Sequence, residues 1–108
     1  MIEAYPLYWP EGWQRTQSHK RDRSHKFKQA FGANRDDLLA ELRRLGARNV
    51  ILSTNIPLRR DGLPYADARV PNDPGVAVYF EYKKNRMCFA CDKYQTVSEN
   101  IRAIALTI

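Results

Sequence analysis

The chain has 108 residues, of which 44% are hydrophobic, and its 18 Lys and Arg against 12 Asp and Glu give a net charge of +6. No apolar run approaches the roughly 18 residues of a membrane span, and the first residues lack the basic and apolar stretches of a secretion signal. We therefore expect a cytoplasmic protein with no membrane partner and reduced cysteines. This length predicts one domain, with an N-terminal segment over residues 1–28 and a globular core over 29–108.

Residues 1–14 carry four aromatic side chains, with two prolines and a glycine between them. The prolines prevent a regular helix, so this segment is predicted to be extended. Two interpretations stay open. The aromatic side chains either cover an open edge or face of a sheet, or they offer stacking platforms for unpaired bases.

A basic tract follows over residues 15–28, which read RTQSHKRDRSHKFK and carry +5 of the total charge of +6. One concentrated basic segment on a nearly neutral body indicates an anionic partner, most simply nucleic acid. The alternative is an ordinary solvated face. The candidate phosphate-binding residues are the six cations of this tract: Arg15, Lys20, Arg21, Arg23, Lys26 and Lys28.

The first helix is predicted to begin at Asn34 as the N-cap residue and to end at Gly46. Asp36 and Asp37 suit the positive start of a helix, and two arginines suit its end. Four leucines at helical spacing predict one buried stripe: Leu38, Leu39, Leu42 and Leu45.

Residues 49–54 are predicted to form a buried strand, followed by a loop over residues 55–75 that is rich in proline and glycine. Loops of this length in small domains are usually functional or mobile. Together with the N-terminal aromatics, this loop gives a second set of candidates, for binding a partner protein: Trp9, Trp13, Arg59, Arg60 and Tyr65.

Residues 76–82 and 87–92 are predicted to form a β-hairpin around a basic turn. The second strand contains Cys88 and Cys91, a spacing that also occurs in zinc sites. In a strand, however, the two side chains point to opposite faces, so we expect two separate thiols and no metal.

The last helix opens with Thr96 and Glu99, which form a capping box. Its apolar stripe runs to Ile108 without a cap, which suggests a truncated or lost extension. We expect this stripe to be partly uncovered and to favour a homodimer. The alternative is that Tyr8, Trp9 and Trp13 cover it within one chain.

These elements predict an α+β fold with a three- to four-stranded, mainly antiparallel sheet and two helices packed on one face. The order helix–strand–strand–strand–helix is similar to that of double-stranded-RNA-binding domains. Those domains place basic residues at the start of the second helix, where this chain has Val97 to Asn100. The similarity is therefore one of topology only.

No catalytic signature is apparent. Glu81 and Lys83, with Asp61, Asp67 and Asp73 upstream, are faintly similar to the carboxylates and lysine of metal-dependent nucleases. That chemistry needs two carboxylates on one divalent ion, and a cross-strand charge pair is the simpler interpretation. We expect no enzymatic activity and no cofactor.

The stretches STNIPLRRDGLPYA, DPGVAVYF and FACDKY resemble a family of uncharacterised phage and bacterial proteins, and the resemblance runs from about Ser24 to Ile108. Longer members of that family carry a C-terminal J domain. This chain has no His-Pro-Asp tripeptide, so no chaperone stimulation is expected. The resemblance implies a phage or mobile-element setting and lends no residue a catalytic role.

The leading hypothesis is a non-enzymatic module that binds nucleic acid without sequence specificity through the basic tract. The alternative is a module that docks a host or phage protein through the aromatic N-terminus and the loop over residues 55–75. Dependence on salt separates the two, because phosphate contacts release counterions and apolar docking does not.

Overall fold

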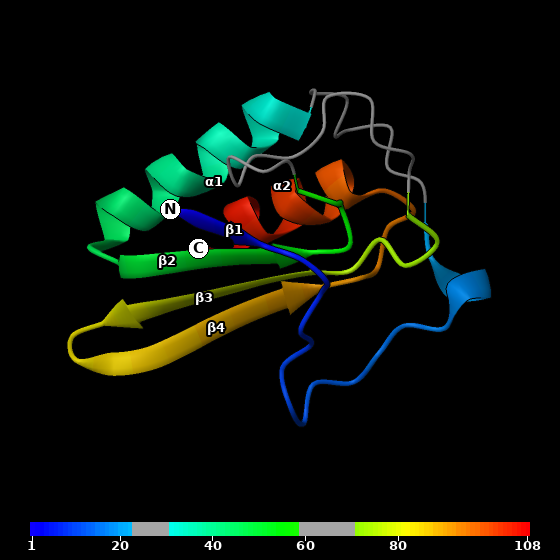
Figure 1. Cartoon of the computed structure of the whole chain (residues 1–108), viewed down its shortest axis with the longest axis horizontal. Helices are drawn as coiled ribbons and strands as arrows, with labels where there is room; N and C mark the ends of the chain where they lie inside the picture. Colours follow the sequence, from blue (N-terminus) through cyan, green and yellow to red (C-terminus); the bar gives the residue numbers. More distant parts are fainter. Residues whose placement is uncertain (23–30, 59–70) are drawn as a thin grey trace.

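The computed structural model describes residues 1–22, 31–58 and 71–108. Its elements are β1 (Ile2–Ala4), the 3₁₀ helix η1 (Ser18–Lys20), α1 (Phe31–Leu45), β2 (Arg48–Thr54), β3 (Val76–Tyr82), β4 (Asn85–Cys91) and α2 (Val97–Thr107). The strands form one sheet in the order β1-β2-β3-β4, and both helices lie on the same side of it (Figure 1). The predicted α+β class is confirmed. The sheet is mixed, because β1 runs parallel to β2 while the other pairs are antiparallel.

The strand β1 is a feature that the sequence pattern does not predict. Three residues are too few to show an alternating pattern, and the pairing partner lies far away in the sequence. Ile2 pairs with Ile51, and Ala4 pairs with Ser53. Glu3, between them, points to the helix side and lies 3.4 Å from the Arg35 guanidinium of α1. Burial raises the pKa of Glu3 despite this ion pair.

The hydrophobic core lies between the helices and the sheet. The predicted leucine stripe of α1 is confirmed at its centre, where Leu38 and Leu42 are fully buried. They share the core with Leu52 of β2, Val78 of β3 and Ile101 of α2, each at most 1% exposed. Burial of such side chains contributes about 1.5–3 kcal/mol each, which is the main force that holds the helices on the sheet.

The predicted N-cap at Asn34 is wrong. Asn34 lies inside α1, and it is fully buried. Its Nδ2 donates to the Ser98 carbonyl oxygen at 3.1 Å and to Ser98 Oγ at 2.6 Å. A buried amide needs partners, and Asn34 finds them on α2, so it joins the two helices.

The N-cap bond of the predicted capping box of α2, from the backbone of Glu99 to the side chain of Thr96, is confirmed. Thr96 Oγ1 accepts from the Glu99 backbone N–H at 3.1 Å. Most of the α2 stripe is covered, because Val97, Ile101 and Ile104 are at most 3% exposed, whereas Ile108 at its end is half-buried. The three buried residues pack in the core against the sheet and α1, and the homodimer stays a prediction.

The alternation of the strands divides the sheet into two faces. Leu52, Val78 and Phe89 are paired in register and face the helices. The neighbouring row, Ile51, Tyr79 and Cys88, therefore points to the other face. We call this second face the outer face of the sheet.

The predicted hairpin is confirmed, but its turn is tighter than expected. Glu81 pairs with Arg86 and Tyr82 pairs with Asn85, which leaves only Lys83 and Lys84 in the turn. Their φ angles are +49° and +67°. Positive φ at both central residues is the type I′ geometry, which matches the twist of the strands and usually selects Asn and Gly.

Candidate nucleic-acid interface

Two aspartates bind two arginines of the described part of the predicted basic tract and tie this part to the body of the molecule. Arg15 Nε donates to Asp92 Oδ2 at 2.8 Å, and Arg15 Nη2 lies 2.5 Å from Asp73 Oδ1. Arg21 Nη2 lies 3.5 Å from Asp92 and 3.6 Å from Asp73, and Arg21 Nε donates to the Asp92 carbonyl oxygen at 3.0 Å. These two guanidinium groups therefore fix the N-terminal segment to the end of β4 and to the residues before β3.

Asp92 is the buried centre of this network, with only 3% of its side chain exposed. Burial alone would raise its pKa, but Thr16 and the Arg15 guanidinium donate to the carboxylate and lower the pKa below the ordinary value of 3.8. Asp92 is therefore ionised at neutral pH, and its charge is neutralised within the chain.

Two of the six predicted phosphate-binding residues thus have structural partners. Lys20 lies exposed in η1. Arg23, Lys26 and Lys28 lie outside the described residues. Arg15 and Arg21 are poor candidates for phosphate contacts, because a ligand would have to replace two carboxylates.

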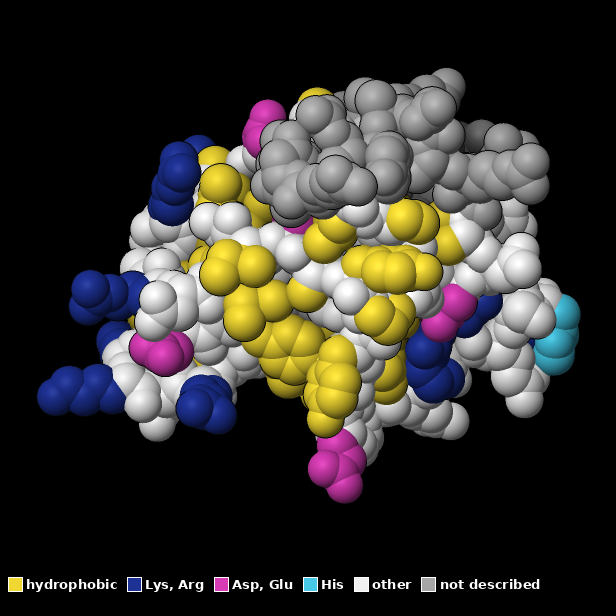
Figure 2. Space-filling model, viewed as in Figure 1, with side chains coloured by type: hydrophobic (Ala, Val, Ile, Leu, Met, Phe, Trp, Pro, Cys, Tyr) yellow, Lys and Arg dark blue, Asp and Glu magenta, His cyan; other side chains and the backbone are white. Residues whose placement is uncertain are grey.

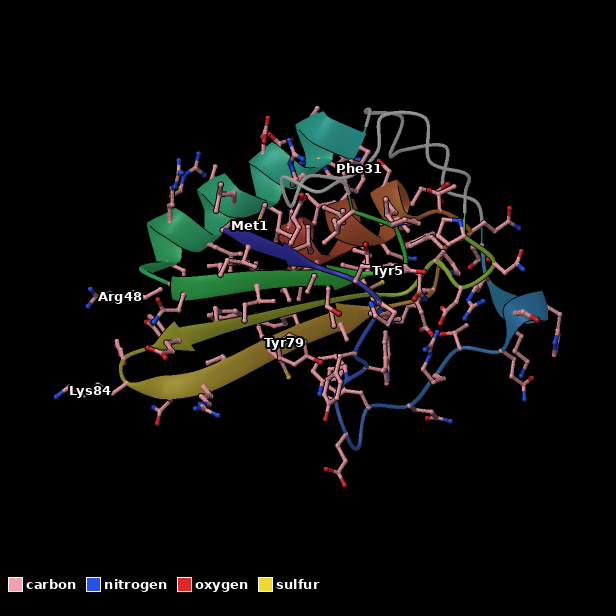
Figure 3. All side chains as sticks on the ribbon, in the orientation of Figure 1. Met1, Tyr5, Phe31, Arg48, Tyr79 and Lys84 are labelled. Carbon is pink, nitrogen blue, oxygen red and sulfur yellow. The ribbon has the colours of Figure 1, made fainter. Side chains whose placement is uncertain are left out.

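A second group of cations lies at the end of the sheet opposite η1, where Figure 3 labels Arg48 and Lys84. We call this group the basic end. Lys and Arg side chains project from this end of the molecule in the space-filling view (Figure 2). All of its six cations are exposed, and they come from the end of α1, the start of β2 and the β3–β4 turn: Arg43, Arg44, Arg48, Lys83, Lys84 and Arg86.

The basic end has few neighbouring carboxylates. Glu41 lies 2.9 Å from Arg44, and Glu81 is paired in register with Arg48 and Arg86. Six cations against these two carboxylates leave a balance of +4. Charge segregated in this way creates a positive potential that attracts anions.

The turn at the tip of the basic end holds its lysines in an unfavourable backbone conformation. A left-handed conformation at a residue other than glycine costs about 1 kcal/mol or more. Lys83 and Lys84 both adopt it. Lys83 Nζ also lies 5.3 Å from the centre of the Tyr82 ring. The turn therefore presents two cations where Asn and Gly would be more stable.

The aromatic N-terminal segment packs on the outer face of the sheet. The Leu7 backbone N–H donates to Asn55 Oδ1 at 3.0 Å, and the Tyr8 N–H donates to Ser53 Oγ at 2.7 Å. The segment thus lies against this face through its backbone, and the role of its aromatic side chains, as a cover or as stacking platforms, stays a prediction. Tyr8 nevertheless keeps most of its own ring exposed.

The candidate partner-binding residues do not form one described surface. Trp9 is used internally, because its Nε1 donates to the Trp13 carbonyl oxygen at 2.8 Å and the Arg15 guanidinium lies 4.4 Å from its ring centre. Trp13 is 41% exposed and lines a cleft beside β4. Arg59, Arg60 and Tyr65 lie outside the described residues.

The described members of the nuclease-like set do not converge. Asp73 lies just before β3, whereas Glu81 lies near the end of that strand. Asp61 and Asp67 lie outside the described residues. Among the residues that the structure describes, no three His, Cys, Asp or Glu side chains are grouped to hold a metal ion.

The two cysteines lie on opposite faces of β4, as predicted. Cys88 pairs with Tyr79 on the outer face, whereas Cys91 pairs with Val76, and its Sγ donates to Asn100 Oδ1 at 3.2 Å. Burial raises the pKa of Cys91.

We expect iodoacetamide at pH 8 to alkylate Cys88 before Cys91. Only thiolates react, and burial keeps the thiolate fraction of Cys91 low. Alkylation of Cys91 should therefore accelerate at higher pH. Mass spectrometry of the digested protein measures both rates, and faster alkylation of Cys91 at pH 8 would contradict the assignment of faces.

No protein-family model, curated protein or solved structure matches this chain. The resemblance to the phage and bacterial family therefore remains an expectation. Within the described ranges, neither helix is long and apolar enough to cross a membrane. The proposal for a function therefore rests on the charges and shape of the described surface.

Proposed function

We propose that this chain is a non-enzymatic nucleic-acid-binding module and that the basic end makes its main phosphate contacts. The observation that carries the proposal is the segregation of six exposed cations at one end of the sheet, with two carboxylates beside them. Phosphate contacts by Lys and Arg supply most of the affinity in binding without sequence specificity. The basic tract, through Lys20 and the residues that follow it, is the second source of such contacts. A phage or mobile-element setting and a cytoplasmic location belong to the same proposal.

The test uses the turn itself. Replacing Lys83→Asn and Lys84→Gly removes two cations and installs the pair that a type I′ turn prefers. The variant should therefore unfold at a higher temperature than the wild type while binding nucleic acid roughly tenfold more weakly at low salt. A loss of binding in a more stable protein cannot be attributed to misfolding.

Binding is measured by fluorescence anisotropy with a labelled oligonucleotide over a series of salt concentrations. The slope of log K against log salt should become less steep by about 1.5, since each lost phosphate contact removes roughly 0.7–0.9. The comparison variant is Lys20→Gln with Lys93→Gln, which removes two cations away from the basic end and, because Lys20 is itself a proposed second contact, should weaken binding less than the turn variant does. If the comparison variant weakens binding and the turn variant does not, the phosphate contacts lie in the tract.

A cleft beside β4 favours a second candidate function, the docking of a partner protein. The cleft has a volume of about 460 Å³. In the described part of the chain, β4 is the last strand of the sheet, so its outer edge can pair with an extended peptide. Its apolar lining comes from the N-terminal segment, β4, the connection after β4 and α2: Trp13, Phe89, Cys91, Tyr94, Ile104 and Leu106.

Capture from a lysate of the native host tests this second function. A partner docked in the cleft should remain bound after nuclease treatment and at high salt. It should be lost with Leu106→Glu, which places a charge at an exposed position of the lining. If nuclease treatment releases the captured proteins, they were bound through nucleic acid, and the docking function would be wrong.

A further inference from the structure

The outer face of the sheet carries an apolar surface that the basic end does not use. One row crosses all four strands, because Ile2 pairs with Ile51, Ile51 with Tyr79 and Tyr79 with Cys88. Hydrophobic side chains gather over the middle of this side of the molecule (Figure 2), and Tyr79 lies among them (Figure 3). We call this surface the open face, and its members are Ile2, Tyr8, Ile51, Tyr79 and Cys88.

The open face is accessible although it is apolar. Ile2 is 66% exposed, Tyr8 is 71% exposed and Ile51 is 37% exposed. The N-terminal segment covers the next row, where Ser53 and Ala77 are buried. It reaches this row at Tyr79, which is half-buried beside Tyr8, while Ile2 and Ile51 stay exposed. Exposed apolar side chains that adjoin one another in this way are typical of interaction sites.

The two tyrosines of the open face are held in place by hydrogen bonds. Tyr79 Oη donates to the Tyr8 carbonyl oxygen at 2.5 Å, and the Tyr8 N–H donates to Ser53 Oγ at 2.7 Å. Their ring centres lie 6.2 Å apart. Burial, with the nearby Cys88 and Tyr8, raises the pKa of Tyr79 to about 12, so its hydroxyl stays a donor at neutral pH. These bonds fix the Tyr79 hydroxyl and the Tyr8 backbone, and they place the two rings beside each other before any ligand arrives.

The basic end continues directly from this surface. Glu81 lies two residues after Tyr79, and its partner Arg86 lies two residues before Cys88, so both are on the same face about 7 Å away at the rise of a strand. Arg48 pairs with Glu81 in that row. One face of the sheet thus carries flat aromatic rings next to exposed guanidinium groups.

We propose that the open face binds unpaired bases and that the ligand is a single-stranded nucleic acid whose phosphates lie toward the basic end. Aromatic side chains on a sheet stack bases that are unpaired, whereas the bases of a duplex are stacked on one another and are inaccessible to such rings. The adjacent cations favour this anionic ligand over an apolar protein surface. This inference rests on the proposed function and specifies its ligand.

Anisotropy with a short labelled oligothymidylate and with a duplex of the same length tests the inference at one low salt concentration. The wild type should bind the single strand more tightly than the duplex. Tyr8→Leu should weaken single-strand binding about 5- to 10-fold, the lower part of the range for one lost stack, and should leave duplex binding unchanged. Tyr8 is exposed, so this variant should fold, which circular dichroism checks.

Tyr79→Leu is the second variant and should have the same effect, and ultraviolet cross-linking of the oligothymidylate should label peptides that contain Tyr8 or Tyr79. The matched control is Trp13→Leu, an exposed aromatic of the cleft beside β4, which should bind like the wild type.

Equal binding of duplex and single strand, together with tyrosine variants that bind like the wild type, would overturn the inference. In that case a loss with the Lys83→Asn, Lys84→Gly variant would keep the proposed function. Binding of neither nucleic acid would overturn both and leave the open face to a protein partner.

Discussion

Asp92→Asn is expected to lower the free energy of unfolding by about 2–4 kcal/mol at pH 7. The substitution keeps the shape of the side chain but removes the charge that faces Arg15 at 2.8 Å and Arg21 at 3.5 Å. Arg21 is only 10% exposed, so solvent does not replace the lost carboxylate. Arg15 is more exposed, which keeps the effect below that of a fully buried pair. Denaturation by urea measures the change.

Asp36→Asn is the matched control, because Asp36 is 73% exposed and lies 3.7 Å from Arg35. Exposed ion pairs of this kind contribute about 0–1 kcal/mol. If the two variants were equally stable, the network around Asp92 would not hold the N-terminal segment.

The effect of Asp92→Asn should depend on pH. The pKa of Asp92 is lowered below 3.8 in the folded protein, so the unfolded chain binds the proton first as pH falls. The carboxylate therefore contributes its full stability above pH 3.8, and this contribution is lost as the pH falls through the folded pKa. The difference between wild type and variant should be constant near neutral pH and shrink below pH 3.8.

Local patterns predicted the elements that bury a regular apolar face. The leucine stripe of α1, the capping residue Thr96 of α2 and the hairpin of β3 and β4 were all accessible to such patterns. The strand β1 was not, because its three residues pair with β2 across more than forty positions of sequence. Asn34 was misassigned because a good capping residue and a buried amide that joins two helices look alike in sequence.

The cationic surface was harder to predict than the fold, because charge counted along the sequence does not show which distant residues lie together in space. Residues outside the basic tract sum to only +1, and that sum conceals the basic end. The topology could have shown it. The helix that contains Arg44 ends just before the strand that begins at Arg48. The hairpin formed by the antiparallel neighbour of that strand turns at the same end of the sheet, so the cations of all three segments lie together there. Conversely, Arg15 and Arg21 were assigned to phosphates because their carboxylate partners, Asp73 and Asp92, lie more than fifty residues away in sequence.

The Asn100 side chain joins the start of α2 to the end of β4, to the connection after β4 and to the residues just before β3. Its Nδ2 donates to the Pro74 carbonyl oxygen at 2.9 Å and to the Tyr94 carbonyl oxygen at 3.1 Å. Its Oδ1 accepts from the Tyr94 N–H at 3.0 Å and from Cys91 Sγ at 3.2 Å. The side chain is fully buried, so water cannot replace any of these bonds.

Asn100→Asp is therefore expected to cost about 3–5 kcal/mol at pH 7, because it turns two donors into a carboxylate oxygen that faces two carbonyl oxygens. Burial and these oxygens should raise the folded pKa of the new carboxyl group above its ordinary value of about 3.9. The folded variant then binds a proton before the unfolded chain does, and the protonated group donates to one carbonyl again. The variant should regain stability as the pH falls from 7 toward 4, in a range where Asp92 is still ionised. Asn100→Leu, which has no group to titrate, is the control and should show no such recovery. If the two variants had the same pH dependence in urea denaturation, Asn100 would not be bonded as described.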